Sequence, residues 1–372
     1  MEYAMVAAAR RDVILRELEL RGSIMNAALA ARLGVSQMTL RRDLIALESN
    51  GLLVRVHGGA LSPGVAIQQE RADPLASRAS ERPVATIGMI VPTSAYYFPE
   101  VIRGASQAAR ELNCRLVVGA TSYSEAEELR QAQRLIDRGV DALLITPHDT
   151  IHEDSPLLEL LERAPVPIVV VERSIDEAMA GRLEWVRSDH SYGAEIAVRH
   201  LVDEGHQRIA LAARPVATAT GLNIGYQRAM RATGNKAGRM RRELPHPPAG
   251  QNVLISELTR LLDDCLAQGV TAAIILGDAD SMAFTDLVIE RGLRVPEDFG
   301  VIAYDDEISA LAAVPLTAVA PPKHELGHTA LRLVMDRLRL GDERARSVVR
   351  MILLPSLIVR ESTRRTGDSV RL

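Results

Sequence analysis

The chain has 372 residues, enough for two or three domains at about 150 residues each. Hydrophobic residues make up 47% and charged residues 25%, which excludes a mainly disordered or fibrous chain. The net charge of −4 excludes a chain that is polybasic throughout. Residues 1–60 hold eight Arg against six Asp and Glu, or +2, which leaves −6 for the remainder. A basic N-terminal part permits DNA contact at that end.

Cysteine usage and hydropathy exclude several further classes of protein. Cys114 and Cys265 have no CxxC or metal-ligand spacing around them, so we predict no disulfide framework, no metal and no cofactor. The first residues lack the basic and apolar regions of a signal peptide. No apolar run reaches the roughly 18 residues of a membrane span. We therefore expect a cytoplasmic protein that does not enter a membrane.

Residues 1–61 are dominated by helical periodicity. A first helix ends near Gly22, a second covers residues 26–33, and a third begins after an N-cap at Ser36 and runs to about residue 48. The buried stripe of the third helix is predicted to be Leu40, Leu44 and Leu47. A β-rich run and a Gly-Gly turn over residues 52–59 predict a small hairpin. Three helices and a hairpin indicate a winged helix-turn-helix domain.

The rest of the chain changes character twice. Residues 62–83 are rich in Ala, Gln, Glu, Arg and Pro and predict a linker. From residue 84 to 372, short apolar runs alternate with amphipathic helices, which is typical of βαβ units with helices on both faces of a parallel sheet. The pattern occurs twice. We expect an N-lobe of about 84–190 plus 320–345, and a C-lobe of about 191–319 plus 346–365.

Two segments carry a resemblance to a known DNA-binding family. They are RRDVILRELELRG and LAARLGVSQMTLRRDLIALESNGLLVRVHGGA, within residues 10–61. Together they resemble the head of the DeoR family of bacterial regulators. A helix-turn-helix needs a tight turn before its third helix, and Gly34-Val35-Ser36 supplies it. The resemblance implies binding to double-stranded operator DNA through the major groove.

The exposed start of the third helix and the hairpin tip hold the candidate DNA contacts. Gln can read adenine, and Arg can read guanine or bind phosphate. The candidates are Ser36, Gln37, Met38, Thr39, Arg41, Arg42, Arg55 and His57. Plainer interpretations stay open: an Arg pair can be a solvated face, Asp43 can pair locally with an Arg, Ser36 can be an N-cap, and His57 can be a turn residue.

A second resemblance covers residues 85–364. Its segments include IGMIVPTSAYYFPEVIRGASQAARELNCRLVVGAT, VDALLITP, VRSDHSYGAEIAVRHLVDEGHQRIALAA, DSMAFTDLVIERGLRVPEDFGVIAYDDEISAL and LLPSLIVREST. Together they are similar to the effector-binding core of the lactose/galactose-repressor (LacI/GalR) family. The implied fold is α/β: a two-lobed, type I periplasmic-binding-protein-like core with parallel sheets, behind an N-terminal winged helix-turn-helix domain. The implied ligand lies between the lobes, beyond the carboxyl ends of the strands.

The family positions for ligand contacts fall on aromatic, acidic and Arg side chains. Aromatic faces suit the C–H face of a sugar ring, and carboxylates or Arg suit its hydroxyls. The candidates are Tyr97, Phe98, Arg173, Asp189, Asp280 and Asp305. Alternatives stay open for each: the aromatics can pack under the helix that begins at Pro99, the acids can cap helices, and Arg173 can form a surface ion pair.

Three positions depart from the family pattern. Leu222 stands where an Arg usually clamps the ligand, Ala279 replaces an Asn, and Pro321 replaces a polar residue. Losing a bidentate donor weakens recognition of hydroxylated or anionic ligands. The family's usual DNA head and hinge helix are also absent, so the linker over residues 62–83 must couple the two parts in another way.

The combined prediction is a ligand-responsive transcription regulator, a repressor of a carbohydrate-utilisation operon, that acts as a homodimer on a symmetric operator. Its effector is a small sugar or sugar derivative; a non-sugar metabolite is the alternative. An enzyme is a weaker alternative, because no GxxxxGK[ST], strand-linked GxGxxG or HExxH motif is present. A soluble sugar receptor is disfavoured by the DNA-binding head.

Overall fold

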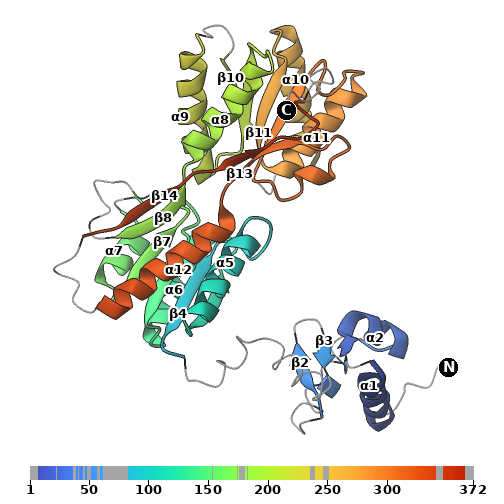
Figure 1. Cartoon of the computed structure of the whole chain (residues 1–372), viewed down its shortest axis with the longest axis vertical. Helices are drawn as coiled ribbons and strands as arrows, with labels where there is room; N and C mark the ends of the chain where they lie inside the picture. The colour runs from blue at the N-terminus through green and yellow to red at the C-terminus, as the bar shows by residue number, and fades with distance from the viewer. Residues whose placement is uncertain are drawn as a thin grey trace, which may run out of the picture. The chain divides into compact units, whose positions relative to one another are not determined.

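The computed structural model divides the chain into two compact units, Met1–Arg82 and Pro83–Leu372 (Figure 1). Each unit is treated by itself. The described residues are 7–21, 23–36, 39–40, 42–44, 47, 52–56, 59–61, 83–152, 154–173, 175, 181, 183–234, 239–245, 251–340 and 347–364. No helix within these ranges is both long and apolar enough to cross a membrane.

The first unit contains the predicted helices around a small sheet. Its elements are α1 (Ala7–Arg21), β1 (Ser23–Met25), α2 (Asn26–Leu33), β2 (Val54–Val56) and β3 (Gly59–Leu61). The described residues 39–40, 42–44 and 47 are also helical. The predicted stripe is buried: Leu40, Leu44 and Leu47 are 1%, 1% and 4% exposed. Full burial of each such side chain contributes about 2 kcal/mol.

The sheet of this unit has one strand more than the sequence predicted. β1 pairs antiparallel with β3, so the order is β1-β3-β2 instead of a two-stranded hairpin. Ile24, at the centre of β1, is 7% exposed and packs in the same cluster as Leu29 and Ala60. A three-residue strand is too short to show period-2 alternation, which is why the sequence did not reveal it.

The second unit consists of two α/β lobes. The N-lobe sheet has the order β14-β8-β7-β6-β4-β5, and all of its pairings are parallel. Its strands are β4 (Thr86–Val91), β5 (Arg115–Ala120), β6 (Ala142–Ile145), β7 (Ile168–Val171), β8 (Glu184–Ser188) and β14 (Arg350–Leu353). Its helices are α5 (Phe98–Glu111), α6 (Glu125–Asp137), α7 (Pro156–Arg163) and α12 (Lys323–Leu340).

The C-lobe repeats this plan with the sheet order β10-β9-β11-β12-β13-β15. Its strands are β9 (Ile209–Ala213), β10 (Arg239–Glu243), β11 (Ala272–Leu276), β12 (Gly300–Tyr304), β13 (Thr317–Ala320) and β15 (Ser356–Ile358). Only the β13–β15 pairing is antiparallel in the described part of this sheet. Its helical elements are α8 (His190–Asp203), α9 (Ala217–Ala232), α10 (Gln251–Ala267), α11 (Asp278–Glu290) and the 3-10 turn η2 (Ser309–Leu311).

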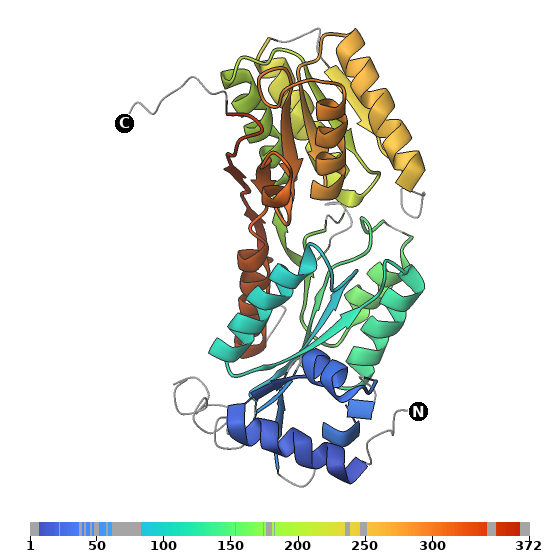
Figure 2. The same cartoon turned by 90° about the vertical axis from the view of Figure 1, so that its right-hand side faces the viewer.

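One part of the lobe assignment from sequence was wrong. Residues 346–365 were expected in the C-lobe, but Met351 pairs with Val186 in the N-lobe sheet. The chain then crosses to the C-lobe, where Leu357 pairs with Val319. Pro355 separates the two strands, because proline has no N–H to continue a ladder. The dark red segment that joins the lobes is visible in Figures 1 and 2.

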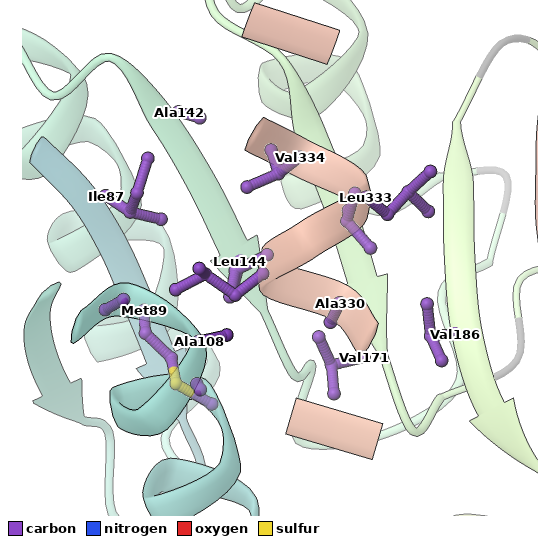
Figure 3. Packing of buried hydrophobic residues seen from close by; sticks show 14 of the residues in the cluster. Ile87, Met89, Ala108, Ala142, Leu144, Val171, Val186, Ala330, Leu333 and Val334 are labelled. Atoms are coloured by element: carbon purple, nitrogen blue, oxygen red, sulfur yellow. The ribbon is translucent and has the colours of Figure 1, made fainter. Parts of the chain in front are cut away.

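Each sheet is covered by helices on both faces. In the N-lobe, Ile87, Leu144 and Val171 point from the sheet toward Ala330 and Val334 of α12 (Figure 3). α5 packs beside α12 on this face, and α6 and α7 cover the other face. The burial of both faces explains the continuous apolar runs that the sequence shows for these strands.

The contact between α5 and α12 depends on glycine. A Cβ on Gly104 would lie 1.9 Å from the backbone oxygen of His324, and a Cβ on Gly327 would lie 1.9 Å from that of Val101. Both distances are far below van der Waals contact, so only glycine permits this approach. The pair of helices is thereby fixed at the start of α12, where the chain has just crossed from the C-lobe.

Candidate functional site

The start of the third helix of the first unit has the predicted turn and cap. Gly34 has φ of 63°, in the left-handed region that favours glycine. The Ser36 hydroxyl accepts a hydrogen bond from the Thr39 N–H at 3.2 Å, as an N-cap does. Arg42 is exposed, whereas Leu40 and Leu44 are buried. The helix therefore presents Arg42 on the side opposite its buried stripe.

Only part of the predicted DNA-contact set falls within the described residues. Ser36, Thr39 and Arg42 are described, and Arg55 lies on β2 with only its backbone described. The remaining candidates, Gln37, Met38, Arg41 and His57, lie outside the described residues. The set therefore remains a prediction that rests on the order of the motifs.

The local pairing considered for Asp43 is present, with partners on α1. Asp43 is 3% exposed and accepts from Arg10 at 2.9 Å and from Arg11 at 3.1 Å. A buried carboxylate with two guanidinium partners fixes α1 against the third helix. Arg10 and Arg11 thus have a structural role in this unit.

In the second unit, strained backbone lies beyond the carboxyl ends of several strands, among them β4, β7 and β12. Tyr96 follows β4, Glu172 follows β7, and Asp305 and Asp306 follow β12. Their φ values are 57°, 62°, 104° and 56°, although none of them is glycine. Such residues cost about 1–3 kcal/mol each and concentrate at functional sites. The carboxyl ends of parallel strands are also where α/β proteins bind ligands.

A chain of polar contacts joins the two lobes at these strand ends. The Tyr97 hydroxyl donates to Glu172 in the N-lobe, and the second Glu172 oxygen accepts the Ser188 N–H at 2.9 Å. His190 lies at the crossing to the C-lobe, with Nε2 3.4 Å from Glu172 and Nδ1 3.0 Å from the Tyr304 hydroxyl. The two lobes are thus connected through buried polar side chains as well as through the main chain.

The pKa values of the two side chains Glu172 and Tyr97, which are hydrogen-bonded to each other, shift in opposite directions. Burial alone would raise the pKa of the Glu172 carboxyl, but the contacts from His190, Tyr97 and Ser188 outweigh it and lower that pKa. Burial, with the negative charge of Glu172, raises the pKa of the Tyr97 hydroxyl well above its usual value. Tyr97 therefore remains a neutral donor to an ionised Glu172.

Asp305 has the most unusual environment of the predicted ligand residues. Burial raises its pKa to about 8, and the nearby Asp278 and Glu172 carboxylates add to the increase while Lys323 opposes it. The Lys323 ammonium donates to the Asp305 backbone oxygen, and its Nζ lies 5.3 Å from the Tyr97 ring centre. Near neutral pH, the Asp305 side chain is a protonated carboxyl that can both donate and accept.

A direct contact between the lobes lies beside Asp305. The Tyr96 hydroxyl of the N-lobe accepts the backbone N–H of Asp278 at 3.0 Å. Burial raises the pKa of this hydroxyl, and the negative charges of Asp305 and Asp278 raise it further. Tyr96, Asp278 and Asp305 therefore form one electrostatically coupled group across the lobe boundary.

Other predicted ligand residues have partners within the chain. Phe98 is 2% exposed and belongs to the N-lobe core, which is the packing alternative considered from sequence. The Arg173 guanidinium lies 6.0 Å from the Phe98 ring centre, and its buried Nε has no partner among the described residues. Tyr97 contacts the Phe98 ring edge-on at 5.3 Å. Tyr97 and Arg173 therefore lie at the boundary, while Phe98 supports them from the core.

Asp189 caps a helix, as the alternative considered from sequence describes, whereas Asp280 forms an ion pair within the C-lobe. Asp189 caps α8 by accepting the Tyr192 N–H at 2.9 Å, and it also accepts the Ser191 hydroxyl at 2.6 Å. Burial would raise the pKa of Asp189, but these bonds outweigh it and lower it. Asp280 is held by Arg214 through two bonds of 2.7 Å. Their roles as ligand contacts stay predictions.

Sequence reasoning missed several residues at this boundary: Tyr96, Glu172, Asp278, Lys323 and Tyr304. A signal was available for two of them, since Glu172 directly follows β7 and Tyr304 ends β12. Tyr96 and Glu172 also have positive φ values, which set their side-chain directions and which the sequence does not reveal.

The departure at position 222 has a structural explanation. Leu222 is 0% exposed and packs in the C-lobe cluster that also contains Tyr226 and Val319. An Arg at this place would need a carboxylate or ligand partner, because an unpaired buried charge is costly. Leu222 instead extends the apolar interior.

Comparisons with known proteins agree with this architecture. A DeoR-like helix-turn-helix model matches residues 10–64, and a periplasmic-binding-protein-like model matches residues 198–363. The chain is 28% identical over 274 residues to the ribose operon repressor of Escherichia coli K12, covering 68% of this chain and 75% of that repressor. It is 29% identical over 269 residues to the transcriptional regulator CelR of Thermobifida fusca, covering 72% and 76%.

A solved structure shows the same likeness. The complex of the transcriptional regulator CelR with cellobiose superposes with a TM-score of 0.63 at 26% identity, covering 91% of this chain and 98% of that chain. This chain therefore carries a DeoR-like helix-turn-helix domain and a periplasmic-binding-protein-like domain, and it is similar to the ribose operon repressor and to CelR. These relatives are transcription regulators, which confirms the prediction that the chain is not an enzyme.

Proposed function

We propose that this protein is a ligand-responsive repressor that controls carbohydrate-utilisation genes. The observation that carries the proposal is the joining of a DNA-binding head to a two-lobed effector core in one chain. The names of the relatives support the ligand class: one is a ribose operon repressor, and another regulator binds cellobiose. The effector is accordingly a small sugar or sugar derivative.

The effector binds at the lobe boundary described above. Tyr97, Arg173 and Asp305 supply an aromatic face, a cation and a protonatable carboxyl there. The main chain crosses between the lobes near residues 189, 321 and 355, so lobe closure changes the geometry of the whole core. A ligand that contacts both lobes favours the closed arrangement by its differential affinity for it.

Closure then changes the affinity of the head for its operator. The head contacts DNA with the third helix in the major groove and with the hairpin against the backbone. The candidates proposed for these contacts are Ser36, Gln37, Met38, Thr39, Arg41, Arg42, Arg55 and His57. The linker predicted over residues 62–83 carries the signal, because no LacI-type hinge helix precedes the core in the sequence.

The active form in this proposal is a homodimer. Two-fold symmetric proteins bind pseudo-palindromic operators with two copies of the recognition helix. The core supplies the interface, since the head is a small unit with its own apolar cluster. Sedimentation velocity of the full chain, alone and with a duplex of one and of two half-sites, measures this stoichiometry. A monomer on both duplexes would contradict the dimer.

An operator-binding experiment tests the proposed function. The full chain first selects its operator from a random duplex pool, and the affinity is then measured with and without ribose, cellobiose, glucose and related sugars. We expect at least one sugar to change the operator affinity about fivefold or more, which is a usual allosteric coupling. The absence of a selected sequence would refute a sequence-specific regulator, whereas an unresponsive operator complex would refute the sugar effector.

Arg42→Ala separates the head from the core in this experiment. The substitution should weaken operator binding and, if Arg42 contacts phosphate, reduce the salt dependence by about one unit of slope. Sugar binding should be unchanged. Arg294→Ala, which removes an exposed Arg of the core, is the matched control and should leave operator affinity unchanged. Equal operator affinities for wild type and Arg42→Ala would contradict the assigned DNA-facing surface.

A further inference from the structure

The cations at the boundary of the C-lobe already have carboxylate partners. Arg214 binds Asp280 through two bonds of 2.7 Å and also donates to a backbone oxygen at 2.8 Å. Arg360 binds Asp306 through bonds of 2.7 and 3.1 Å. Bidentate pairs of this kind use the donors that would otherwise recognise a phosphate or carboxylate.

Lys323, another basic group at this boundary, also has a carboxylate partner within the chain. Lys323 is 7% exposed and donates to the Glu307 carboxylate and to the Asp305 backbone oxygen. The position where related cores place an Arg holds the buried Leu222. Among the described residues of the C-lobe side, the basic groups at this boundary are therefore neutralised within the chain.

One carboxylate oxygen at the same place has no partner. Asp278 is 0% exposed, and its Oδ2 accepts the N–H groups of residues 307, 308 and 309 at 2.5, 2.6 and 3.1 Å. Its Oδ1 is buried and has no hydrogen-bond partner among the described residues. A buried acceptor without a partner is costly, so this atom is poised for a donor that the described residues do not supply.

The N-lobe side adds buried donors without partners. Arg173 Nε and Ser188 Oγ are buried and unbonded in the described structure. Ser188 ends β8 and Arg173 follows β7, so both lie at the carboxyl edge of the N-lobe sheet. A hydroxyl group can donate to Asp278 and also accept from Arg173 or Ser188, which a phosphate, as an acceptor alone, cannot.

We propose that the boundary binds an uncharged, hydroxyl-rich ligand and discriminates against phosphorylated or carboxylated ones, and that Asp278 is the residue that sets this discrimination. The inference rests on the proposed function and defines its ligand class. The Asp278 and Glu172 carboxylates both act electrostatically on the buried, protonated Asp305 carboxyl, so their negative charges reach this part of the boundary. An anion placed among them meets like charge in a region shielded from water.

The protonation of Asp305 is consistent with a negative electrostatic potential at this boundary. Its carboxyl retains a proton because burial and the neighbouring Asp278 and Glu172 disfavour a further negative charge. A ligand phosphate would meet the same two neighbours. At about 6 Å and an effective dielectric constant of about 20, one like-charge contact weakens binding on the order of a hundredfold.

Matched ligand pairs test the inference by titration calorimetry on the full chain at pH 7. The pairs are D-ribose with D-ribose 5-phosphate and D-glucose with D-glucose 6-phosphate, and cellobiose is added as a larger neutral probe. We expect a neutral sugar to bind wild type about a hundredfold more tightly than its phosphorylated partner. In Asp278→Asn, which keeps an oxygen for residues 307–309 but turns the free atom into a donor, that ratio should fall below about tenfold.

Asp263→Asn is the matched control, because it removes one exposed carboxylate from the same lobe and should keep the wild-type ratio. Tighter binding of a phosphorylated sugar, an unchanged ratio in Asp278→Asn, or no binding by any neutral probe would each overturn the inference. Operator selection by the same chain distinguishes these failures from failure of the proposed function. A regulator released from its operator by a phosphorylated sugar would retain the function and refute this ligand class.

Discussion

The buried carboxyl of Asp305 makes the stability of the core depend on pH in an unusual direction. Its pKa rises from an ordinary 3.8 to about 8 because the group is buried near other carboxylates. The folded state therefore holds a proton that the unfolded chain releases above about pH 4. The stabilisation is complete below the unfolded pKa and is lost as the pH rises through the folded pKa.

The magnitude follows from the two pKa values. Between them, each pH unit removes at most about 1.4 kcal/mol, the free energy of one pKa unit. Near the folded value the slope levels off, so the step from pH 6 to pH 8 removes about 2 kcal/mol. Asp305→Asn keeps the shape and cannot ionise, and Asn tolerates positive φ, so the variant should lack this loss.

Urea unfolding at several pH values between 6 and 8.5 measures the effect. The single Trp, Trp185, is buried in the N-lobe, so its fluorescence follows unfolding of the core, with circular dichroism as a second probe. The difference between wild type and Asp305→Asn should grow by about 2 kcal/mol from pH 6 to pH 8 in favour of the variant. Subtracting the two profiles removes the titration of groups that both chains share.

Asp263→Asn provides the control, because Asp263 is exposed and bridges Arg291 at the surface. Its pH profile should run parallel to that of wild type. Parallel profiles for wild type and Asp305→Asn would refute the assignment of a buried, protonated carboxyl. If the variant lost stability more steeply with rising pH than wild type, the predicted pH dependence would have the wrong sign.

Three further substitutions test the packing around the site and the head. Gly104→Ala places a methyl 1.9 Å from the His324 backbone oxygen, so urea unfolding should show a loss of about 2 kcal/mol or more; wild-type stability would contradict the close helix contact. Arg214→Met leaves the buried Asp280 charge unpaired and should cost about 3–5 kcal/mol, with partial recovery on adding Asp280→Asn; equal stability of both variants would contradict the pairing. Ser36→Ala removes the N-cap of the recognition helix and should cost about 1 kcal/mol, seen as faster hydrogen exchange of that helix; unchanged exchange would show that the cap contributes nothing.

The sequence alone determined the organisation of the chain. Helical spacing gave the stripe of Leu40, Leu44 and Leu47, and uninterrupted apolar strands between helices gave two parallel sheets covered on both faces. These features are local, because a repeat of 3.6 or 2 residues reflects which face is buried. Of the predicted ligand residues, Asp305 directly follows β12, whereas Tyr97 lies six residues after β4 and immediately precedes α5.

What the sequence did not determine depends on contacts between distant residues. β1 forms because residue 24 meets residue 60, and the final apolar run divides between both lobes because Pro355 interrupts it at the crossing. The apparent ligand residue Asp280 is held by Arg214, 66 residues away. No local pattern records such a partner, because periodicity reports the environment of a face and not the identity of the group opposite it.

The electrostatic character of the lobe boundary was likewise decided by tertiary structure. Glu172, Asp278 and Asp305 are ordinary acids in the sequence, separated by more than a hundred residues in the first interval and by tens in the second. Strand order and positive φ bring them into one buried group, where their charges interact through a poorly screening interior. The sequence supplied the carboxylates, and the fold decided that Asp305 keeps its proton while Glu172 gains hydrogen-bond partners that lower its pKa.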